Sequence, residues 1–116
     1  GTYALSAADL RRVQQIQNRR DKARFVLESD ASRSWTPGEQ VLTFGSEGRV
    51  NLPGMGSFGG VVAEVHWNGT AHVVASTARL TATKVNGHKV SSQVLSPGDR
   101  VRVGKVGFVY QAPRAT

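Results

Sequence analysis

The amino-acid sequence predicts an all-β sandwich preceded by an N-terminal helical arm. Short β-rich runs separated by turn residues fill the chain beyond Pro37, which is typical of sandwiches and barrels. Two Asn-Gly pairs, at 68–69 and 86–87, lie between such runs and are typical of two-residue β-hairpin loops. Apolar residues at helical spacing occur only within residues 6–24. The 116 residues suffice for one domain, or for one domain with an arm.

The predicted helix begins at Ser6, whose side chain suits the N-cap, and Asp9 in the first turn complements the helix dipole. An apolar stripe at helical spacing is formed by Leu10, Val13 and Ile16. Polar and charged residues follow, so the helix has too little apolar surface for a core element. We therefore expect a helical arm or linker at 1–22, the sandwich at 23–111 and a tail at 112–116.

Nine or ten short strands are expected in the sandwich. Residues 100–103 read Arg-Val-Arg-Val, an alternation typical of a half-buried strand. Residues 29–38 have the composition of a loop instead. The clearest strand signals lie at 25–27, 41–44, 50–52, 61–67, 83–85, 88–90, 100–103 and 106–110. The aromatic residues expected in the core and its turns are Trp35, Phe44, Trp67, Phe108 and Tyr110.

The three histidines do not form a metal site in the predicted sandwich. A two-residue loop at Asn68-Gly69 pairs Val65 with His72, and neighbouring residues on a strand point to opposite faces. His66 and His72 then lie on opposite faces, where one metal ion cannot bind both. His88 flanks a different loop. The sequence therefore predicts no metal site.

The second hairpin loop, Asn86-Gly87, places two lysines side by side. Counting outward from the loop, Lys84 pairs with Lys89, so like charges oppose each other on one face. Arg100 and Arg102 share a face of a later strand and extend the patch. Folding does not call for this arrangement, so an acidic partner surface is the functional interpretation. A solvated, screened pair of lysines is the alternative.

Composition and motifs exclude several classes of function. The chain has no cysteine, which excludes disulfides and thiolate-bound metal centres. The glycines between residues 54 and 60 lack the Lys-Ser/Thr of a phosphate loop and the helix of a dinucleotide site. No nucleophile elbow or paired carboxylates are present, so we expect no enzyme and no cofactor. No apolar run approaches the ~20 residues of a membrane span. We expect a cytoplasmic segment of a longer protein, without membrane contact.

The order of strands and turns resembles a forkhead-associated (FHA) domain over residues 23–111. This family is an eleven-stranded β-sandwich that typically binds phosphothreonine peptides through loops at one end. The most specific part of the resemblance is its closing part. It consists of a Val-Asn-Gly turn, a Gly-Asp turn about ten residues later, an alternating strand and a final aromatic strand. The matching segments are 25–28, 42–46, 50–53, 61–66, 85–87, 94–104 and 107–110.

The resemblance also shows where this chain departs from the family. Ser46 stands where the family has the arginine that holds the phosphate, and Arg49 substitutes for it only in a reshaped loop. The family's Ser-Arg-x-x-His run keeps only its serine, Ser57, and its asparagine before the Val-Asn-Gly turn is Thr81. The candidate binding residues are Ser46, Arg49, Ser57, Arg79, Lys84, Asn86 and Lys89. The resemblance implies a non-catalytic interaction module with degenerate phosphothreonine recognition and an acidic or phosphorylated protein partner.

A nucleic-acid-binding module is the alternative. Residues 85–87 and 95–99 also resemble the end of a small RNA-binding module found in ribosomal proteins and pseudouridine synthases. Residues 79–116 hold seven Lys or Arg and one Asp, a net charge of +6 that suits this role. That module requires two helices before the Val-Asn-Gly strand, whereas residues 61–76 read as a hairpin. Steep salt dependence would distinguish nucleic-acid binding from docking on a protein.

Overall fold

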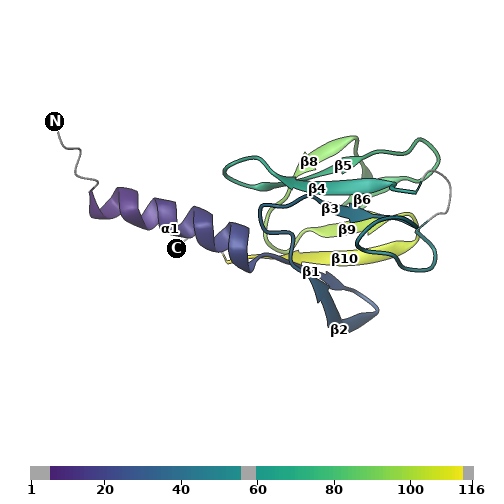
Figure 1. The fold of residues 1–116 in the computed structure, drawn as a ribbon, viewed down its shortest axis with the longest axis horizontal. Helices are drawn as coiled ribbons and strands as arrows, with labels where there is room; N and C mark the ends of the chain where they lie inside the picture. The colour runs from purple at the N-terminus through teal and green to yellow at the C-terminus, as the bar shows by residue number, and fades with distance from the viewer. Residues whose placement is uncertain (1–5, 56–59, 114–116) are drawn as a thin grey trace.

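The computed structural model describes residues 6–55 and 60–113 and places two antiparallel sheets face to face, with one helix beyond them (Figure 1). The six-stranded sheet has the order β2-β1-β10-β9-β6-β7. Its strands are β1 (Arg24–Leu27), β2 (Asp30–Trp35), β6 (Thr83–Val85), β7 (His88–Lys89), β9 (Arg100–Val103) and β10 (Val106–Gln111). The four-stranded sheet, in the order β3-β4-β5-β8, contains β3 (Leu42–Phe44), β4 (Ala63–Trp67), β5 (His72–Ser76) and β8 (Ser92–Val94). The predicted sandwich is confirmed.

Helix α1 (Ala7–Lys22) extends away from the sandwich (Figure 1). As predicted, Ser6 is its N-cap, and the Ser6 Oγ accepts a hydrogen bond of 3.1 Å from the Asp9 N–H. The helix buries none of its residues, as its short apolar stripe implies. At its last turn, the Arg20 guanidinium lies 3.0 Å from the Glu39 carboxylate. No helix in the described segments is long and apolar enough to cross a bilayer.

Aromatic rings from both sheets form the centre of the core. Phe44 of β3 packs edge-on against Phe25 of β1 and Phe108 of β10, with ring centroids 5.7 and 5.3 Å apart. Edge-to-face pairs of this kind stabilise beyond the area they bury. The prediction that Phe44, Phe108 and Tyr110 are core residues is confirmed, and each is fully buried. Trp35 packs against the edge of this cluster, 5.8 Å from Phe108.

A buried hydrogen-bonded chain also links the two sheets. The His72 imidazole of β5 lies with Nδ1 2.7 Å from the Tyr110 hydroxyl of β10 and with Nε2 2.9 Å from the Gly38 carbonyl. A carbonyl only accepts, so Nε2 carries the proton and Nδ1 accepts from the tyrosine. Burial lowers the pKa of His72 below its ordinary value of 6.5 and raises the pKa of Tyr110 to about 12. Both groups are therefore neutral at physiological pH.

Two strand predictions were wrong. Residues 29–38 were expected to be a loop, but β2 forms there as an edge strand, with Val26 opposite Ser34 and Phe25 opposite Trp35. Backbone pairing with β1 builds β2, and its side chains are exposed except at Trp35, so no alternating pattern marks it. Residues 50–52 were expected to be a strand, but only Val50 is paired, through an isolated bridge to Phe44.

The two Asn-Gly turns behave differently. Asn86 and Gly87 have φ of 52° and 85°, and Lys84 lies opposite Lys89, as predicted. The register predicted around Asn68 was wrong, because Trp67, not Val65, lies opposite His72 across a four-residue loop. The Asn68 Oδ1 accepts from the N–H groups of residues 70 and 71 and so stabilises the longer loop. His66 and His72 still point to opposite faces, because His66 lies opposite residue 73.

Candidate functional site

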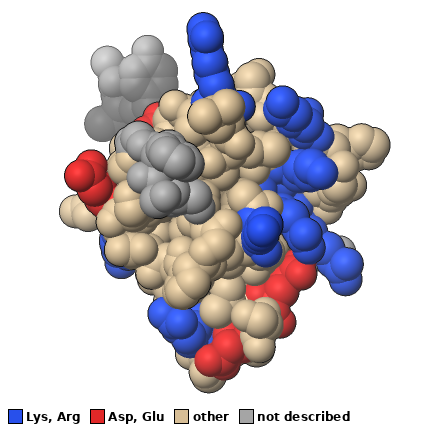
Figure 2. Space-filling view, turned by 90° about the vertical axis from the view of Figure 1, so that its right-hand side faces the viewer, with Lys and Arg blue, Asp and Glu red and all other residues tan. Residues whose placement is uncertain are grey.

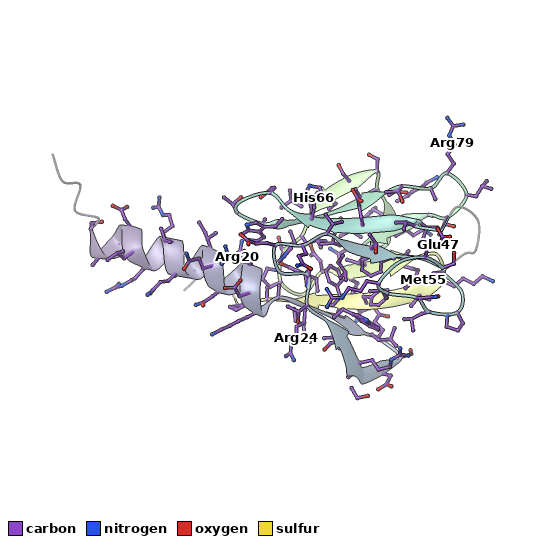
Figure 3. All side chains as sticks on the ribbon, viewed as in Figure 1. Arg20, Arg24, Glu47, Met55, His66 and Arg79 are labelled. Carbon is purple, nitrogen blue, oxygen red and sulfur yellow. The ribbon has the colours of Figure 1, made fainter. Side chains whose placement is uncertain are left out.

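The end of the sandwich opposite α1 carries the loops in which the candidate residues Ser46 and Arg79 lie. Figure 3 shows Glu47, Met55 and Arg79 at this end, far from Arg20 of the helix. Ser46 lies here too, in the loop after β3. Ser57 is outside the described residues. The structure therefore brings the loops around residues 46 and 79 to one end of the molecule.

The loop after β3 is attached closely to the backbone at Gly60. Gly45 has φ of 141°, and a Cβ there would overlap the Gly60 carbonyl oxygen, so only glycine fits. The Glu47 N–H donates to this carbonyl at 3.0 Å, and the Ser46 hydroxyl lies 3.4 Å from it. The Ser46 side chain is short and uncharged, so it offers no cation at the position where the family resemblance places one.

Glu47 adds a negative charge beside Ser46. Its carboxylate lies so close to Gly60 that a Cβ on that glycine would overlap it. The sequence interpretation missed Glu47, although an acidic residue directly after Ser46 was the available signal. A carboxylate in this loop repels an incoming phosphate.

The two arginines of these loops do not approach Ser46 in a common cluster. The Arg49 guanidinium donates to the Thr36 carbonyl at 3.3 Å, in the connection that follows β2. Its backbone N–H donates to the Thr43 hydroxyl at 2.9 Å. Arg79 is exposed, and its side chain points away from the molecule (Figure 3). Thus the Arg49 side chain is hydrogen bonded to the segment after β2, and the Arg79 side chain extends into solvent.

Asn86 lies at the other end of β9 from these loops. Its Oδ1 accepts from the Arg100 N–H at 3.0 Å, and its Nδ2 donates to the Asp99 carboxylate at 3.1 Å. The opposite end of β9 leads to Gly104, whose N–H donates to the Ala82 carbonyl. The four-residue strand therefore separates Asn86 from the loop at Ala82 by roughly 10 Å. Asn86 ties its hairpin to β9 and is not grouped with Ser46.

The outer surface of the six-stranded sheet carries a second candidate site. Lys84 lies opposite Lys89 on one side and opposite Arg102 on the other, so three cations form a row across β7, β6 and β9. Arg100 is exposed on the same face of β9, two residues from Arg102. We call Lys84, Lys89, Arg100 and Arg102 the basic face. In the end view of Figure 2, Lys and Arg side chains gather on the right-hand side.

A groove of about 530 Å³ runs beside the basic face. Glu28, which follows β1, lines it together with Lys84, Arg100 and Arg102. Within the described residues, both ion pairs involve Arg20, so no carboxylate there forms a salt bridge with the basic face. Glu28 was missed at the sequence level, although Gly107 within a predicted strand was a signal for close approach of another group.

Comparisons with known proteins establish the fold. No family model and no curated protein match this chain. Solved structures of FHA domains do match. The FHA domain of an Arabidopsis thaliana hypothetical protein has a TM-score of 0.70 and 11% identity and covers 100% of this chain and 98% of its own. An FHA domain from a study of phosphothreonine-dependent interactions has a TM-score of 0.68 and 21% identity, covering 80% and 98%. The FhaA FHA domain, complexed with the intracellular domain of another protein, has a TM-score of 0.65 and 22% identity, covering 77% and 99%.

Proposed function

We propose that this chain, which has the fold of FHA domains, is a non-catalytic protein-interaction module that contacts its partner without recognising phosphothreonine. Two of the similar structures support a role in protein contact, because one was studied for phosphothreonine-dependent interactions and another was solved with a protein domain bound. The loops of this chain support the loss of phosphate recognition.

The loop after β3 is unsuited to binding a phosphate. A phosphothreonine bears a charge of roughly −1.5 to −2, and proteins bind it with positioned arginines and several hydrogen-bond donors. Here Ser46 supplies a hydroxyl only, and the neighbouring Glu47 supplies a carboxylate beside Gly60. The Arg49 guanidinium is hydrogen bonded to the Thr36 carbonyl. The loop therefore presents a negative charge where phosphate binding needs a positive one.

The second half of the expected phosphate site is weakened as well. Thr81 stands where the resemblance implies an asparagine, and a threonine hydroxyl offers one donor where an amide offers two. The asparagine that the chain does keep, Asn86, uses its side chain on Asp99 and Arg100. Neither Thr81 nor Asn86 therefore supplies the free amide donors that the resemblance implies for binding a phosphate.

The strands before the Val-Asn-Gly turn do not fit the nucleic-acid-binding module that was the alternative. The RNA-binding module that the sequence resembles has two helices before its Val-Asn-Gly strand. In this chain, residues 63–67 and 72–76 are strands β4 and β5. We therefore interpret the positive charge of residues 79–116 as complementary to an acidic surface on a protein partner.

Calorimetric titration with phosphothreonine peptides tests the proposal. We expect no binding tighter than about 100 μM, because that affinity already corresponds to more than 5 kcal/mol of favourable contacts. The variant Ser46→Arg/Glu47→Ser/Thr81→Asn restores the arginine and the asparagine that the family resemblance implies, and it is the positive control. Micromolar binding by the unaltered chain that disappears on dephosphorylation of the peptide would refute the proposal.

A further inference from the structure

We propose that the groove beside the basic face binds a short acidic segment of the partner protein. This inference rests on the proposed function, since it identifies the surface used when the loops do not bind phosphate. It assigns the contact to the outer surface of the six-stranded sheet, away from the loops around Ser46.

The pairing of the strands concentrates positive charge on the basic face beside this groove. Lys89, Lys84 and Arg102 lie opposite one another on three adjacent strands. Directly opposed side chains have Cβ atoms about 4.5–5.5 Å apart, and like charges at this distance destabilise a sheet. A carboxylate placed between two such cations converts the repulsion into attraction. The row therefore gains stability when an acidic ligand is bound.

Glu28 shows that a carboxylate fits beside the basic face. Its N–H donates to the Gly107 carbonyl at 3.0 Å, which holds the residue against β10. Gly107 lies opposite Arg102, and a Cβ on Gly107 would be only 2.9 Å from the Glu28 carboxylate. The carboxylate thus occupies the space that the glycine leaves open. It lines the groove without forming a salt bridge to the basic face, so these cations keep their capacity for an external anion.

The spacing of the arginines favours an extended acidic peptide. Arg100 and Arg102 are two residues apart on β9, which separates them by about 6.6–6.8 Å along the strand. Alternate side chains of an extended peptide have the same spacing, so carboxylates at every second position meet the two guanidinium groups in register. Guanidinium–carboxylate pairs of this kind can be bidentate.

Nucleic acid fits this surface less well. Single-stranded nucleic acid is held by aromatic rings on which bases stack, together with a basic groove. The groove is lined by Glu28, Lys84, Asn86, Gly87, Arg100, Val101 and Arg102, and none of these is aromatic. Within the described residues, the rings of Trp35 and Trp67 pack on Phe108 and His72 instead. A carboxylate in the groove also repels a phosphate backbone.

Fluorescence anisotropy with defined probes tests the inference. The first probe is a labelled peptide with glutamate at alternate positions, and the others are a phosphothreonine peptide and a short single-stranded DNA. We expect Lys84→Glu/Arg102→Glu to weaken binding of the acidic peptide at least tenfold, and Lys84→Gln/Arg102→Gln to weaken it less. The control Arg11→Glu/Arg12→Glu makes the same change of net charge on exposed positions of α1 and should change binding less than twofold.

Glu28→Gln provides a test in the opposite direction, because removing the competing carboxylate should strengthen binding about two- to fivefold. Failure of the acidic peptide to bind, equal weakening by the control, or binding of DNA alone would overturn the inference. Phosphothreonine binding that survives Lys84→Glu/Arg102→Glu would instead contradict the loss of phosphate recognition. The two proposals therefore fail in distinguishable ways.

Discussion

Replacing Tyr110 with phenylalanine should destabilise the sandwich through a single hydrogen bond. The Tyr110 hydroxyl donates to the His72 Nδ1 at 2.7 Å, and both side chains are 0% exposed. Phenylalanine keeps the ring that packs 5.3 Å from Phe25 and removes only the hydroxyl. The substitution thus leaves the His72 Nδ1 as a buried acceptor without a donor.

The structure sets the size of this effect. An unsatisfied buried acceptor costs about 1–3 kcal/mol, because water cannot replace the lost partner. For a domain of roughly 100 residues, each kcal/mol corresponds to about 4–8 °C in melting temperature. A loss of about 2 kcal/mol therefore lowers the melting temperature by about 8–16 °C. The link joins β5 to β10 across the two sheets, so the whole sandwich should respond as one cooperative unit.

Urea unfolding followed by circular dichroism measures the difference at pH 7.5. The matched control is Thr77→Val, which removes an exposed residue's hydroxyl that donates to the Val61 carbonyl at 2.9 Å. Water can take its place, so the control should cost less than about 1 kcal/mol. A loss below about 0.5 kcal/mol for Tyr110→Phe would show that the His72 hydrogen bond does not stabilise the fold.

Three further predictions concern pH and the arm. Because burial lowers the pKa of folded His72 below 6.5, the unfolded chain takes up a proton first as the pH falls, and stability should decrease below pH 6.5. Urea midpoints measured between pH 5 and 7 should show this decrease. The decrease should disappear in His72→Gln. Above pH 10, stability should fall again, because unfolded tyrosine ionises near 10.0 while folded Tyr110 ionises near 12. A chain beginning at Ala23 should keep its melting temperature within a few degrees, because α1 buries no residue; loss of cooperative unfolding would make the helix part of the core.

Elements governed by local chemistry were predictable from the sequence. The Asn86-Gly87 loop needs two residues with positive φ, so its residue types alone determined the register that places Lys84 beside Lys89. The alternation in residues 100–103 likewise placed both arginines outward, because one face of a sandwich sheet must be buried. The basic face was therefore anticipated from two short segments.

Features that depend on side-chain hydrogen bonds within a loop, or on contacts distant in sequence, were not predictable. The loop at Asn68 has the same Asn-Gly pair, yet the Asn68 side chain caps two following N–H groups and lengthens the turn. Strand β2 forms because β1 offers a free edge, and the composition of residues 30–35 carries no sign of that pairing. The Glu28 carboxylate occupies the space beside Gly107. A glycine within a strand indicates a close approach, but the sequence does not say which group approaches. The contacts of these residues are therefore known only from the folded structure.

Mapping the bound acidic peptide by nuclear magnetic resonance tests the central claim most directly. The amide spectrum of the ¹⁵N-labelled chain is recorded during a titration with the peptide that carries alternate glutamates. We expect the largest shifts on Lys84, Arg100 and Arg102, while the amides of residues 45–49 stay unchanged. Shifts centred on residues 45–49 would contradict it, because recognition would then take place at the loops and not on the basic face.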